Sequence, residues 1–233
     1  MEAIILAGGF GTRLKHVVAD VPKPMAPVAG RPFLEYVLDD LADKGASRVI
    51  LAVGYRQEVI RGHFGGAYRG MALVYSSEDT PLFTGGAIRQ ALSLCREERA
   101  VIVNGDTFFD VNLPGMLRFA EETDAPLVIA TRHMVNFERY GVVLSENGRV
   151  TAFEEKRPRE EGDINGGIYV VKRTLLDAMP QKFSFERDFM ERFVSEMPMY
   201  VYPSGGYFID IGVPEDYARA QVDFARPARE GEA

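Results

Sequence analysis

Short apolar runs alternate with helix-like segments over the first half of the chain. Strands are predicted where apolar residues follow one another directly, at residues 3–7, 49–53, 72–76 and 100–104. Helices are predicted where apolar residues recur every three or four positions, at residues 32–45, 58–64 and 86–94. Pro32 and Gly45 bound the first of these helices, as Pro at a helix start and Gly at a helix end usually do. This alternation predicts a mostly parallel sheet with helices on both faces.

Beyond Asp106 the pattern is less regular. Strands are predicted at residues 126–131, 141–145, 149–155, 166–171 and 207–211. The polar segment 156–163 is predicted to join two of these strands, and helices are predicted at residues 185–197 and 214–225. Because the chain shows no internal repeat and no Gly/Ser linker, we expect one α/β domain over residues 1–225, followed by a disordered tail at residues 226–233.

The charge distribution argues against nucleic acid as a partner. The chain of 233 residues has a net charge of −7, and its basic residues are scattered, whereas nucleic-acid affinity depends on clustered Lys and Arg. A small phosphorylated ligand needs only a few well-placed cations, so it stays compatible with this charge. No apolar run approaches the ~18 residues that span a bilayer, so no membrane partner is expected.

The cysteine and histidine residues of the sequence argue against a disulfide framework and against a zinc site. The single cysteine, Cys95, cannot form a disulfide framework and ends an apolar helical pattern, so we interpret it as a core residue in a cytoplasmic protein. The three histidines, His16, His63 and His133, lack the spacing of zinc ligands. The sequence does not indicate an oligomeric state.

A glycine-rich segment, residues 8–14 (GGFGTRL), directly follows the first predicted strand. Glycines let backbone N–H groups approach an anion, and Arg13 adds a forked cation that matches phosphate oxygens. The segment is not a P-loop, because G-x-x-x-x-G-K-[ST] is absent. It is a weak Rossmann fingerprint, because the second strand runs into Gly54, Tyr55 and Arg56 and not into an acidic residue. Alone, it could be a tight glycine turn without a ligand.

Lys23 lies between two prolines, Pro22 and Pro24, which stiffen the backbone on either side of it. A lysine held in this way loses less conformational freedom on binding a phosphate than a lysine on a mobile loop. Without the preceding glycine segment, the same pattern would indicate only a proline-rich surface loop.

The two segments together, G-G-x-G-T-R-L and then P-K-P about ten residues later, resemble the signature of nucleotidylyltransferases that act on sugar 1-phosphates. The resemblance extends over nearly the whole chain. It implies a single three-layer α/β/α domain with a mostly parallel, mixed central sheet, which is a Rossmann-like nucleotidyltransferase fold. It also implies a nucleotide-binding half at about residues 1–110 and a sugar-phosphate-binding half at about residues 111–225.

Two aspartates are expected to bind a Mg²⁺ cofactor. Asp106 follows a predicted strand, at the sheet edge where open α/β folds bind ligands. Asp210 lies in the otherwise apolar run FIDI, where an unpaired carboxylate would be costly. By the resemblance, these residues match the two metal ligands of the family, and Mg²⁺ typically takes one or two carboxylates. The alternative interpretation is an aspartate that caps a loop.

The resemblance also implies the nucleotide contacts. Residues 81–88 (PLFTGGAI) resemble the family's base-recognition turn, in which Gly85 and Gly86 would admit a flat ring against the backbone. Phe83 stands where the commoner form has glycine, and Glu78 would accept hydrogen bonds from guanine. The nucleotide-binding candidates are Leu6, Ala7, Gly8, Gly9, Gly11, Thr12, Glu78, Thr84, Gly85, Gly86, Asn104 and Gly105.

The sugar side of the site is implied by two further motifs, EEK at residues 154–156 and NGGIY at residues 165–169. By this match, Glu155 would bind sugar hydroxyls and Lys156 the phosphate of the sugar. The sugar-phosphate-binding candidates are Gly141, Glu155, Lys156, Asn165 and Gly166.

The expected chemistry needs no general base. A sugar 1-phosphate has a second pKa near ~6 and is mostly a dianion at neutral pH. The difficulty is to bring two polyanions together in line, which requires positioning and positive charge. We therefore expect Arg13 to bind the β- and γ-phosphates, Lys23 the α-phosphate in the transition state, and Lys156 the attacking phosphate.

Several motif versions, among them NGDTFFDV and YFIDIGVPEDY, look like those of D-glycero-D-manno-heptose 1-phosphate guanylyltransferases. The expected reaction joins GTP and the heptose 1-phosphate to give GDP-heptose and pyrophosphate, a precursor step for surface polysaccharide. N-acetylmuramate 1-phosphate uridylyltransferases and mannose 1-phosphate guanylyltransferases use similar motifs and remain alternatives.

Two other classes of protein fit less well. A glycosyltransferase usually shows Asp-x-Asp, whereas Asp106 is followed by Thr, Phe and Phe before Asp110. A non-catalytic nucleotide-sugar sensor could lack Lys23 or a metal-binding aspartate, and this chain keeps both.

Overall fold

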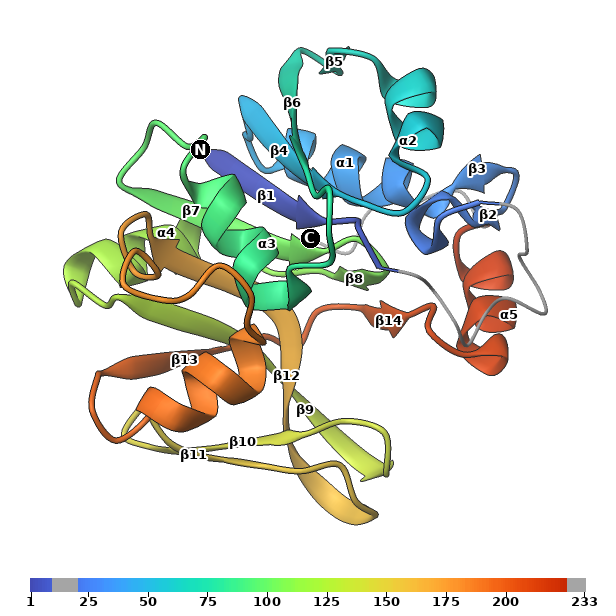
Figure 1. Cartoon of the computed structure of the whole chain (residues 1–233). Coiled ribbons are helices and arrows are strands. Elements are labelled where there is room, and N and C mark those ends of the chain that lie inside the picture. Colours follow the sequence, from blue (N-terminus) through green and yellow to red (C-terminus); the bar gives the residue numbers. More distant parts are fainter. Residues whose placement is uncertain (10–20, 226–233) are drawn as a thin grey trace.

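A ten-stranded mixed sheet runs through the molecule in the computed structural model, which describes residues 1–9 and 21–225 (Figure 1). From one edge to the other, the strands are β10 (Val142–Glu146), β11 (Arg149–Glu154), β13 (Met199–Pro203), β9 (Leu127–Phe137), β12 (Arg159–Lys172), β7 (Arg99–Asn104), β1 (Glu2–Leu6), β4 (Arg48–Val53), β6 (Met71–Ser77) and β5 (Ala67–Tyr68). Strands β7, β1, β4 and β6 are parallel neighbours, as the strand–helix alternation predicts. Antiparallel pairing enters at β12, which lies between β7 and β9.

Helices cover both faces of this sheet, so the expected three-layer α/β/α fold is confirmed. One core contains residues of α1 (Phe33–Asp43), α2 (Gln57–Phe64), α4 (Leu113–Glu122) and α5 (Pro214–Asp223), and the other contains residues of α3 (Phe83–Leu92) and the π-helix η2 (Phe185–Glu191). Because side chains alternate along a strand, Ala3 and Ile5 enter the first core and Ile4 enters the second. Cys95 is a buried member of the second core, and burial raises the pKa of its thiol to about 12.

Two short sheets lie beside the ten-stranded sheet, and one of them connects the C-terminal part of the chain to the first half. Strand β8 (Thr107–Phe109), directly after β7, pairs antiparallel with β14 (Phe208–Asp210), and this register places Asp210 opposite Thr107. Strands β2 (Pro27–Val28) and β3 (Arg31–Pro32) form a hairpin after the 3₁₀ turn η1 (Lys23–Met25). The β14–β8 pairing therefore brings the last third of the chain to the carboxyl end of β7.

The second half of the chain differs from its prediction in four places. The polar segment 156–163 is not only a connection, because β12 begins at Arg159 and pairs with β9 from Phe137 onward. The backbone supplies the pairing there, and most of the polar side chains of the segment are exposed to solvent. Helix α4 and strand β13 were not predicted, although the cap at Asn112 and the following Pro114 are helix-start signals.

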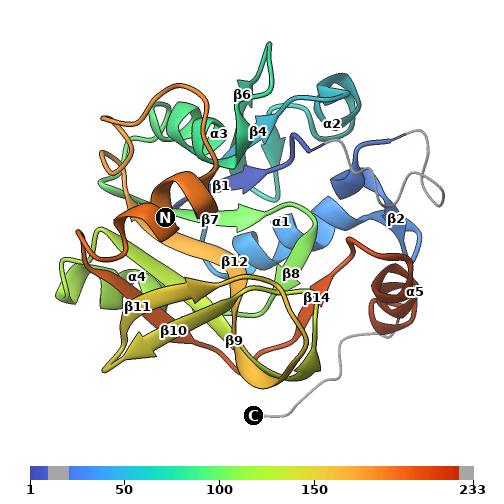
Figure 2. The same cartoon turned by 60° about the horizontal axis from the view of Figure 1, so that its bottom comes forward.

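The fourth difference is the helical stretch predicted at residues 185–197, which is the shorter π-helix η2 followed by turns. Figure 2 shows β9, β10, β11 and β12 gathered at one end of the molecule, away from α2 and β6. In the described part of the chain, no helix is long and apolar enough to cross a bilayer. The tail at residues 226–233 lies outside the described residues.

Candidate functional site

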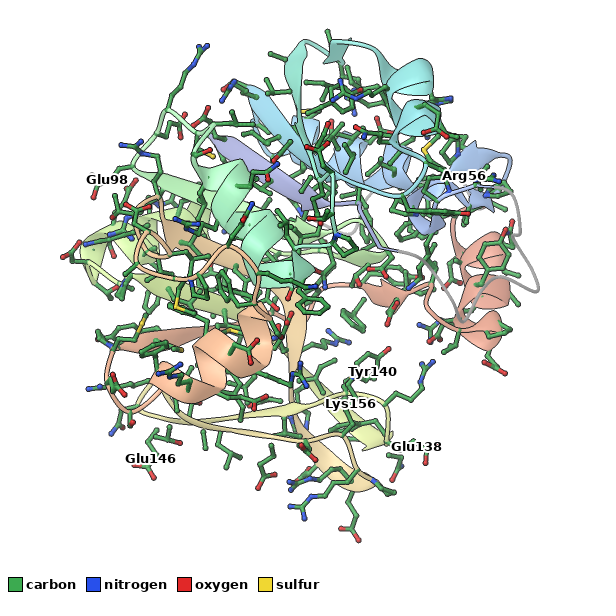
Figure 3. The ribbon with its side chains drawn as sticks, viewed as in Figure 1. Arg56, Glu98, Glu138, Tyr140, Glu146 and Lys156 are labelled. Carbon is green, nitrogen blue, oxygen red and sulfur yellow. The ribbon has the colours of Figure 1, made fainter. Side chains whose placement is uncertain are left out.

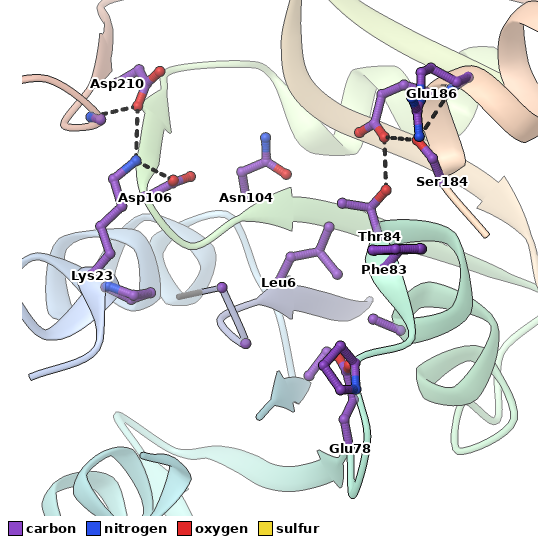
Figure 4. A pocket seen from close by; sticks show the side chains of 18 residues that line it. Leu6, Lys23, Glu78, Phe83, Thr84, Asn104, Asp106, Ser184, Glu186 and Asp210 are labelled. Atoms are coloured by element: carbon purple, nitrogen blue, oxygen red, sulfur yellow. Dashed lines mark hydrogen bonds and ion pairs between the residues drawn. The ribbon is translucent and has the colours of Figure 1, made fainter. Parts of the chain in front are cut away.

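The parallel strands β1, β4 and β7 end at one edge of the sheet, where a cavity of about 710 Å³ opens. Parallel strands present their carboxyl ends on the same side, which is where open α/β sheets bind ligands. The residues that line this cavity come from segments far apart in sequence: Leu6, Gly8, Gly9, Lys23, Pro24, Ala52, Glu78, Pro81, Phe83, Thr84, Ala87, Asn104, Asp106, Ser184, Glu186, Arg187, Asp210 and Gly212. Figure 4 shows Lys23, Asp106 and Asp210 at one end of it, and Glu78, Phe83 and Thr84 at the other.

Asp106 and Asp210 converge on Lys23. The Lys23 ammonium donates to Asp106 Oδ2, and its Nζ lies 3.5 Å from Asp210 Oδ1. Lys23 begins the η1 turn between its two prolines, Asp106 ends the turn after β7, and Asp210 ends β14. The β14–β8 pairing thus brings together two acids that are far apart in the sequence, and the Lys23 ammonium contacts both of them.

Burial raises the pKa of Asp210, and the negative charge of Asp106 raises it further, whereas Lys23 opposes the shift. The Gly212 N–H also donates to Asp210 Oδ1 at 2.8 Å. A Cβ at position 212 would lie 2.8 Å from that same oxygen and 2.9 Å from Lys23 Nζ, so a larger residue there would displace these two charged groups. Sequence reasoning missed Gly212, although it directly follows the apolar run that contains Asp210.

The donor set suits a hard divalent cation that completes its shell with water and phosphate. Within residues 1–9 and 21–225, no three His, Cys, Asp or Glu side chains gather into a metal cluster. Two neighbouring carboxylates are nevertheless what Mg²⁺ typically takes from a protein. The mutual repulsion that raises the pKa of Asp210 is relieved by any cation placed between the two acids.

At the far end of the cavity, Glu78 is half-buried beside Gly8 and Gly54. A Cβ at Gly8 would lie 3.2 Å from Gly54 N and 3.3 Å from Glu78 Oε1, so the glycine permits the close approach of these segments. Glu78 Oε2 accepts the Leu82 N–H at 2.9 Å. Burial raises the pKa of Glu78, and this hydrogen bond partly offsets the shift. One carboxylate oxygen of Glu78 thus orders the 79–82 loop.

Gly85 and Gly86 are packed against another segment of the chain on the side where a Cβ would lie, and neither lines the cavity. Both lie in the first turns of α3, and both of their N–H groups point to the Phe183 carbonyl, at 3.0 Å and 3.3 Å. A Cβ at Gly85 would lie 2.3 Å from the Phe183 ring, and one at Gly86 would lie 2.3 Å from the Gln181 carbonyl. The space above them is therefore occupied by the chain that leads into η2.

Thr84 connects α3 to η2 as well as lining the cavity. Its hydroxyl donates to Glu186 Oε2 at 2.7 Å and accepts the Phe185 N–H at 2.9 Å. Ser184 also donates to Glu186, at 3.0 Å. The nucleotide-side candidates Leu6, Gly8, Gly9, Glu78, Thr84 and Asn104 line the cavity.

Four other nucleotide-side candidates do not line this cavity: Ala7, Gly85, Gly86 and Gly105. Ala7 is buried and continues the pairing of β1, with its N–H donating to Ala52 O at 2.8 Å. Gly105 packs against the end of β1, where a Cβ would lie 2.8 Å from Leu6 O. Gly11, Thr12 and Arg13 lie outside the described residues.

A second cavity of about 640 Å³ contains all five sugar-side candidates, Gly141, Glu155, Lys156, Asn165 and Gly166. Tyr140 and Lys156, labelled in Figure 3, both lie on its wall near β10. Asn165 shapes the irregular part of β12, because its amide donates to Tyr169 Oη at 2.9 Å and accepts the Gly167 N–H at 3.0 Å. A Cβ at Gly166 would lie 2.5 Å from the Phe109 ring, so this glycine is also required by packing.

The two cavities adjoin, because five residues line both of them: Asn104, Ser184, Glu186, Arg187 and Asp210. Sequence reasoning missed Ser184, Glu186 and Arg187. A signal was present, because these polar residues lie beside Phe185 and Phe189, which are buried in the core. In the described part of the chain, the Arg187 guanidinium has no ion-pair partner, and its side chain is exposed.

Comparisons with known proteins show which family this chain belongs to. A D-glycero-alpha-D-manno-heptose 1-phosphate guanylyltransferase of Aneurinibacillus thermoaerophilus is 46% identical over 225 residues, covering 96% of this chain and 98% of that protein. A protein of the same name from Campylobacter jejuni is 43% identical, covering 93% and 97%. The crystal structure of HddC from Yersinia pseudotuberculosis complexed with GMP-PN matches with a TM-score of 0.87 and 34% identity, covering 96% of this chain and 99% of that one. Residues 2–226 match the family model described as nucleotidyl transferase. The chain therefore belongs to the nucleotidyl transferase family.

Proposed function

We propose that this protein transfers GMP from GTP to D-glycero-D-manno-heptose 1-phosphate, giving GDP-heptose and pyrophosphate. The observation that carries the proposal is the junction of the two cavities. Asp210 lines both cavities and faces Lys23 and Asp106, so a nucleotide in one cavity and a sugar phosphate in the other would meet at a set of fixed charges.

The chemical step is a displacement at the α-phosphorus of the nucleotide. A phosphate oxygen of the sugar 1-phosphate forms the new P–O bond, and the bond to the bridging oxygen breaks. Pyrophosphate leaves with that electron pair. The attacking oxygen is already ionised at neutral pH, so the site needs cations and correct orientation and not a general base.

We assign roles in this step to three cations of the described residues and to Arg13. Lys23, fixed between its prolines and two aspartates, would contact the α-phosphate, and Lys156 would hold the attacking phosphate from the wall of the sugar cavity. Arg187 lies where the cavities meet and offers a further guanidinium to the same phosphates. We assign Arg13 to the β- and γ-phosphates, on the resemblance of its motif alone.

We further propose that Asp106 and Asp210 hold Mg²⁺. Bound there, the ion would neutralise the developing charge on the phosphates. Lys23 and the Gly212 N–H would then keep the two carboxylates oriented at the junction. The raised pKa of Asp210 supports this assignment, because Lys23 only partly offsets burial and the repulsion from Asp106, so further positive charge is favourable there.

Guanine is the base that the described groups favour. Glu78 presents a half-buried carboxylate at the end of the cavity opposite the acid pair, and a guanine ring offers it two N–H donors on one edge. The similar enzymes of A. thermoaerophilus and C. jejuni are named guanylyltransferases, and the similar HddC structure contains GMP-PN.

We place the reaction in the cytoplasm, and its product in the synthesis of a surface glycan such as lipopolysaccharide, capsule or S-layer glycan. The sequence resemblance and the single reduced cysteine support this assignment.

The test measures pyrophosphate release by the purified protein with Mg²⁺ present. Each of the four nucleoside triphosphates is paired with heptose, mannose and N-acetylmuramate 1-phosphates. Release is expected to be fastest with GTP and the heptose 1-phosphate, and to stop when EDTA removes the metal. A preference for UTP with N-acetylmuramate 1-phosphate, or for mannose 1-phosphate, would replace the substrate assignment. Tight GTP binding without pyrophosphate release would identify a nucleotide sensor.

A further inference from the structure

Phe83 stands at the base end of the nucleotide cavity in a backbone conformation that aromatic residues rarely adopt. Its φ is +60°, in the left-handed region that favours glycine. Among the described non-glycine residues with positive φ, Phe83 alone is aromatic. Strain of this kind persists where the surrounding structure fixes it, and it gathers at ligand-binding sites.

Hydrogen bonds on both sides of Phe83 hold its backbone in this conformation. The preceding residue, Leu82, donates its N–H to Glu78 and accepts the Phe183 N–H at 3.2 Å. The two glycines that follow Thr84 donate to the Phe183 carbonyl. None of these hydrogen bonds involves the side chain of Phe83, so the phenylalanine ring takes no part in holding the loop through them.

The ring of Phe83 is also not needed for the core. Its side chain is 55% exposed, although α3 buries the residues of its other face. Lys182 Nζ lies 4.8 Å from the ring centroid, and the ring lines the same cavity as Glu78 and Leu6. The ring of Phe83 is thus a flat apolar surface at the end of the cavity that we assign to guanine. The backbone that carries it is strained.

We propose that Phe83 is a stacking platform for the nucleobase, which adds a contact with the face of the purine to the contact of Glu78 with its edge. This inference rests on the proposed function, because it takes the ligand of this cavity to be GTP. Stacking of a base on an aromatic ring changes affinity by roughly 5- to 100-fold, and it is stronger for the larger purine rings than for pyrimidines.

Fluorescence gives a direct test, because the chain contains no tryptophan. Phe83→Trp introduces the sole indole of the protein at the proposed stacking position. Leu94→Trp is the matched control, because Leu94 is an exposed apolar residue just beyond the other end of α3. Titration with GTP is expected to quench the fluorescence of Phe83→Trp with saturation, and to leave the fluorescence of Leu94→Trp unchanged.

Steady-state kinetics provide the second measurement. Phe83→Gly removes the ring while keeping a residue that adopts the observed φ freely, so the KM for GTP is expected to rise about tenfold, whereas the KM for the sugar 1-phosphate stays near the wild-type value. Phe83→Tyr keeps an aromatic ring and is expected to retain the wild-type KM for GTP.

Calorimetric GTP binding to the wild-type protein separates the two hypotheses. The stacking role is wrong, and the proposed function stands, if three results occur together. These are that the wild-type protein binds GTP, that GTP does not quench the fluorescence of Phe83→Trp, and that the KM of Phe83→Gly for GTP is unchanged. Wild-type protein that does not bind GTP would overturn both. An equal rise in both KM values would show that Phe83 supports only the shape of the site.

Discussion

The ammonium group of Lys23 is held in place by its neighbours in the site. Its ammonium lies between two carboxylates that repel each other, and only 15% of its side chain is exposed. The two prolines and the η1 turn fix the backbone that carries it. Its loss would therefore remove both a phosphate contact and the charge that balances the acid pair.

We expect Lys23→Ala to lower kcat/KM by about 10²–10³-fold, because a pre-positioned cation at the reacting phosphate is lost. Pyrophosphate release measures the rate, and circular dichroism checks that the fold is intact. Lys44→Ala is the matched control, because Lys44 also pairs with two aspartates, at 2.6 Å and 2.9 Å, but lines neither of the two adjoining cavities. Near-normal turnover in Lys23→Ala would remove the assigned role.

Glu78 predicts a pH dependence of nucleotide binding. Burial raises its pKa, so its protonated form persists to higher pH than that of an ordinary glutamate. Guanine recognition needs the ionised form, so GTP affinity should fall as the pH drops through this raised pKa, before ordinary carboxylates titrate. The KM for GTP, measured against pH, checks this expectation.

The control for this titration is Glu78→Gln. We expect its KM for GTP to be about tenfold higher at neutral pH, because charge-assisted hydrogen bonds are lost, and to vary less on the acid side. An acid-side profile that is identical in both proteins would show that another group causes the titration.

The backbone conformation of Phe83 indicates that replacing it with glycine would increase the free energy of unfolding. A left-handed conformation costs a non-glycine residue about 1–2 kcal/mol, and glycine loses about 0.5–1 kcal/mol more backbone entropy on folding than other residues. Since the ring is more than half exposed, Phe83→Gly is expected to raise the free energy of unfolding by about 0.5–1 kcal/mol. Urea denaturation measures this change, and a loss of stability would show that the ring contributes to packing.

At the scale of elements, the contact between α3 and η2 determines where the two cavities meet. Gly85 and Gly86 let the 181–183 segment lie directly on α3, and the Thr84–Glu186 hydrogen bond fixes the start of η2. Ser184, Glu186 and Arg187 reach both cavities as a consequence. The glycine pair thus contributes to the site through helix packing.

Gly86→Ala tests this role. Its Cβ would lie 2.3 Å from the Gln181 carbonyl and 2.8 Å from Leu82 Cβ, so we expect the free energy of unfolding to fall by about 2–3 kcal/mol. Gly62→Ala in α2 is the matched control, because no atom lies within 4 Å of its Cβ position, and it should add about 0.5–1 kcal/mol. Equal stability of the two variants in urea denaturation would contradict the packing role.

At the scale of the whole molecule, the site depends on contact between the last third of the chain and the end of β7. Strand β14 comes back from the last third of the sequence to pair with β8, and this pairing completes the acid pair at the end of β7. The sugar cavity adjoins this point, because residues of β10, β11 and β12 line it together with residues of β14 and η2. Binding at the junction should therefore link both halves of the chain.

Ligand binding is expected to raise the melting temperature in a metal-dependent way. If Mg²⁺ links the acid pair to the phosphates, GTP with Mg²⁺ should stabilise the protein by about 2.7 kcal/mol at a hundredfold excess over Kd. GTP with EDTA should stabilise it much less, because two carboxylates then face the phosphates without the cation. Differential scanning fluorimetry measures both conditions, and equal shifts would argue against a metal at Asp106 and Asp210.

Local patterns in the sequence predicted the parallel strands, the helices α1, α2, α3 and α5, and the paired motifs around Gly8 and Lys23, because each depends on neighbouring residues alone. The resemblance added Asp106 and Asp210 as partners. Helix α4, strand β13 and the length of β12 were not predicted. The stability of β12 comes from its pairing with β9, and short-range periodicity does not contain that information.

The sequence by itself determined which residue types are available to the site: a lysine fixed by prolines, an aspartate after a parallel strand, and another inside an apolar run. Only the tertiary structure decided that both acids meet at Lys23, that the Gly85–Gly86 pair is covered by Phe183, and that Arg187 lies between two cavities. The physical reason is that these contacts join segments far apart in the chain, so they depend on strand pairing and helix packing and not on local preference.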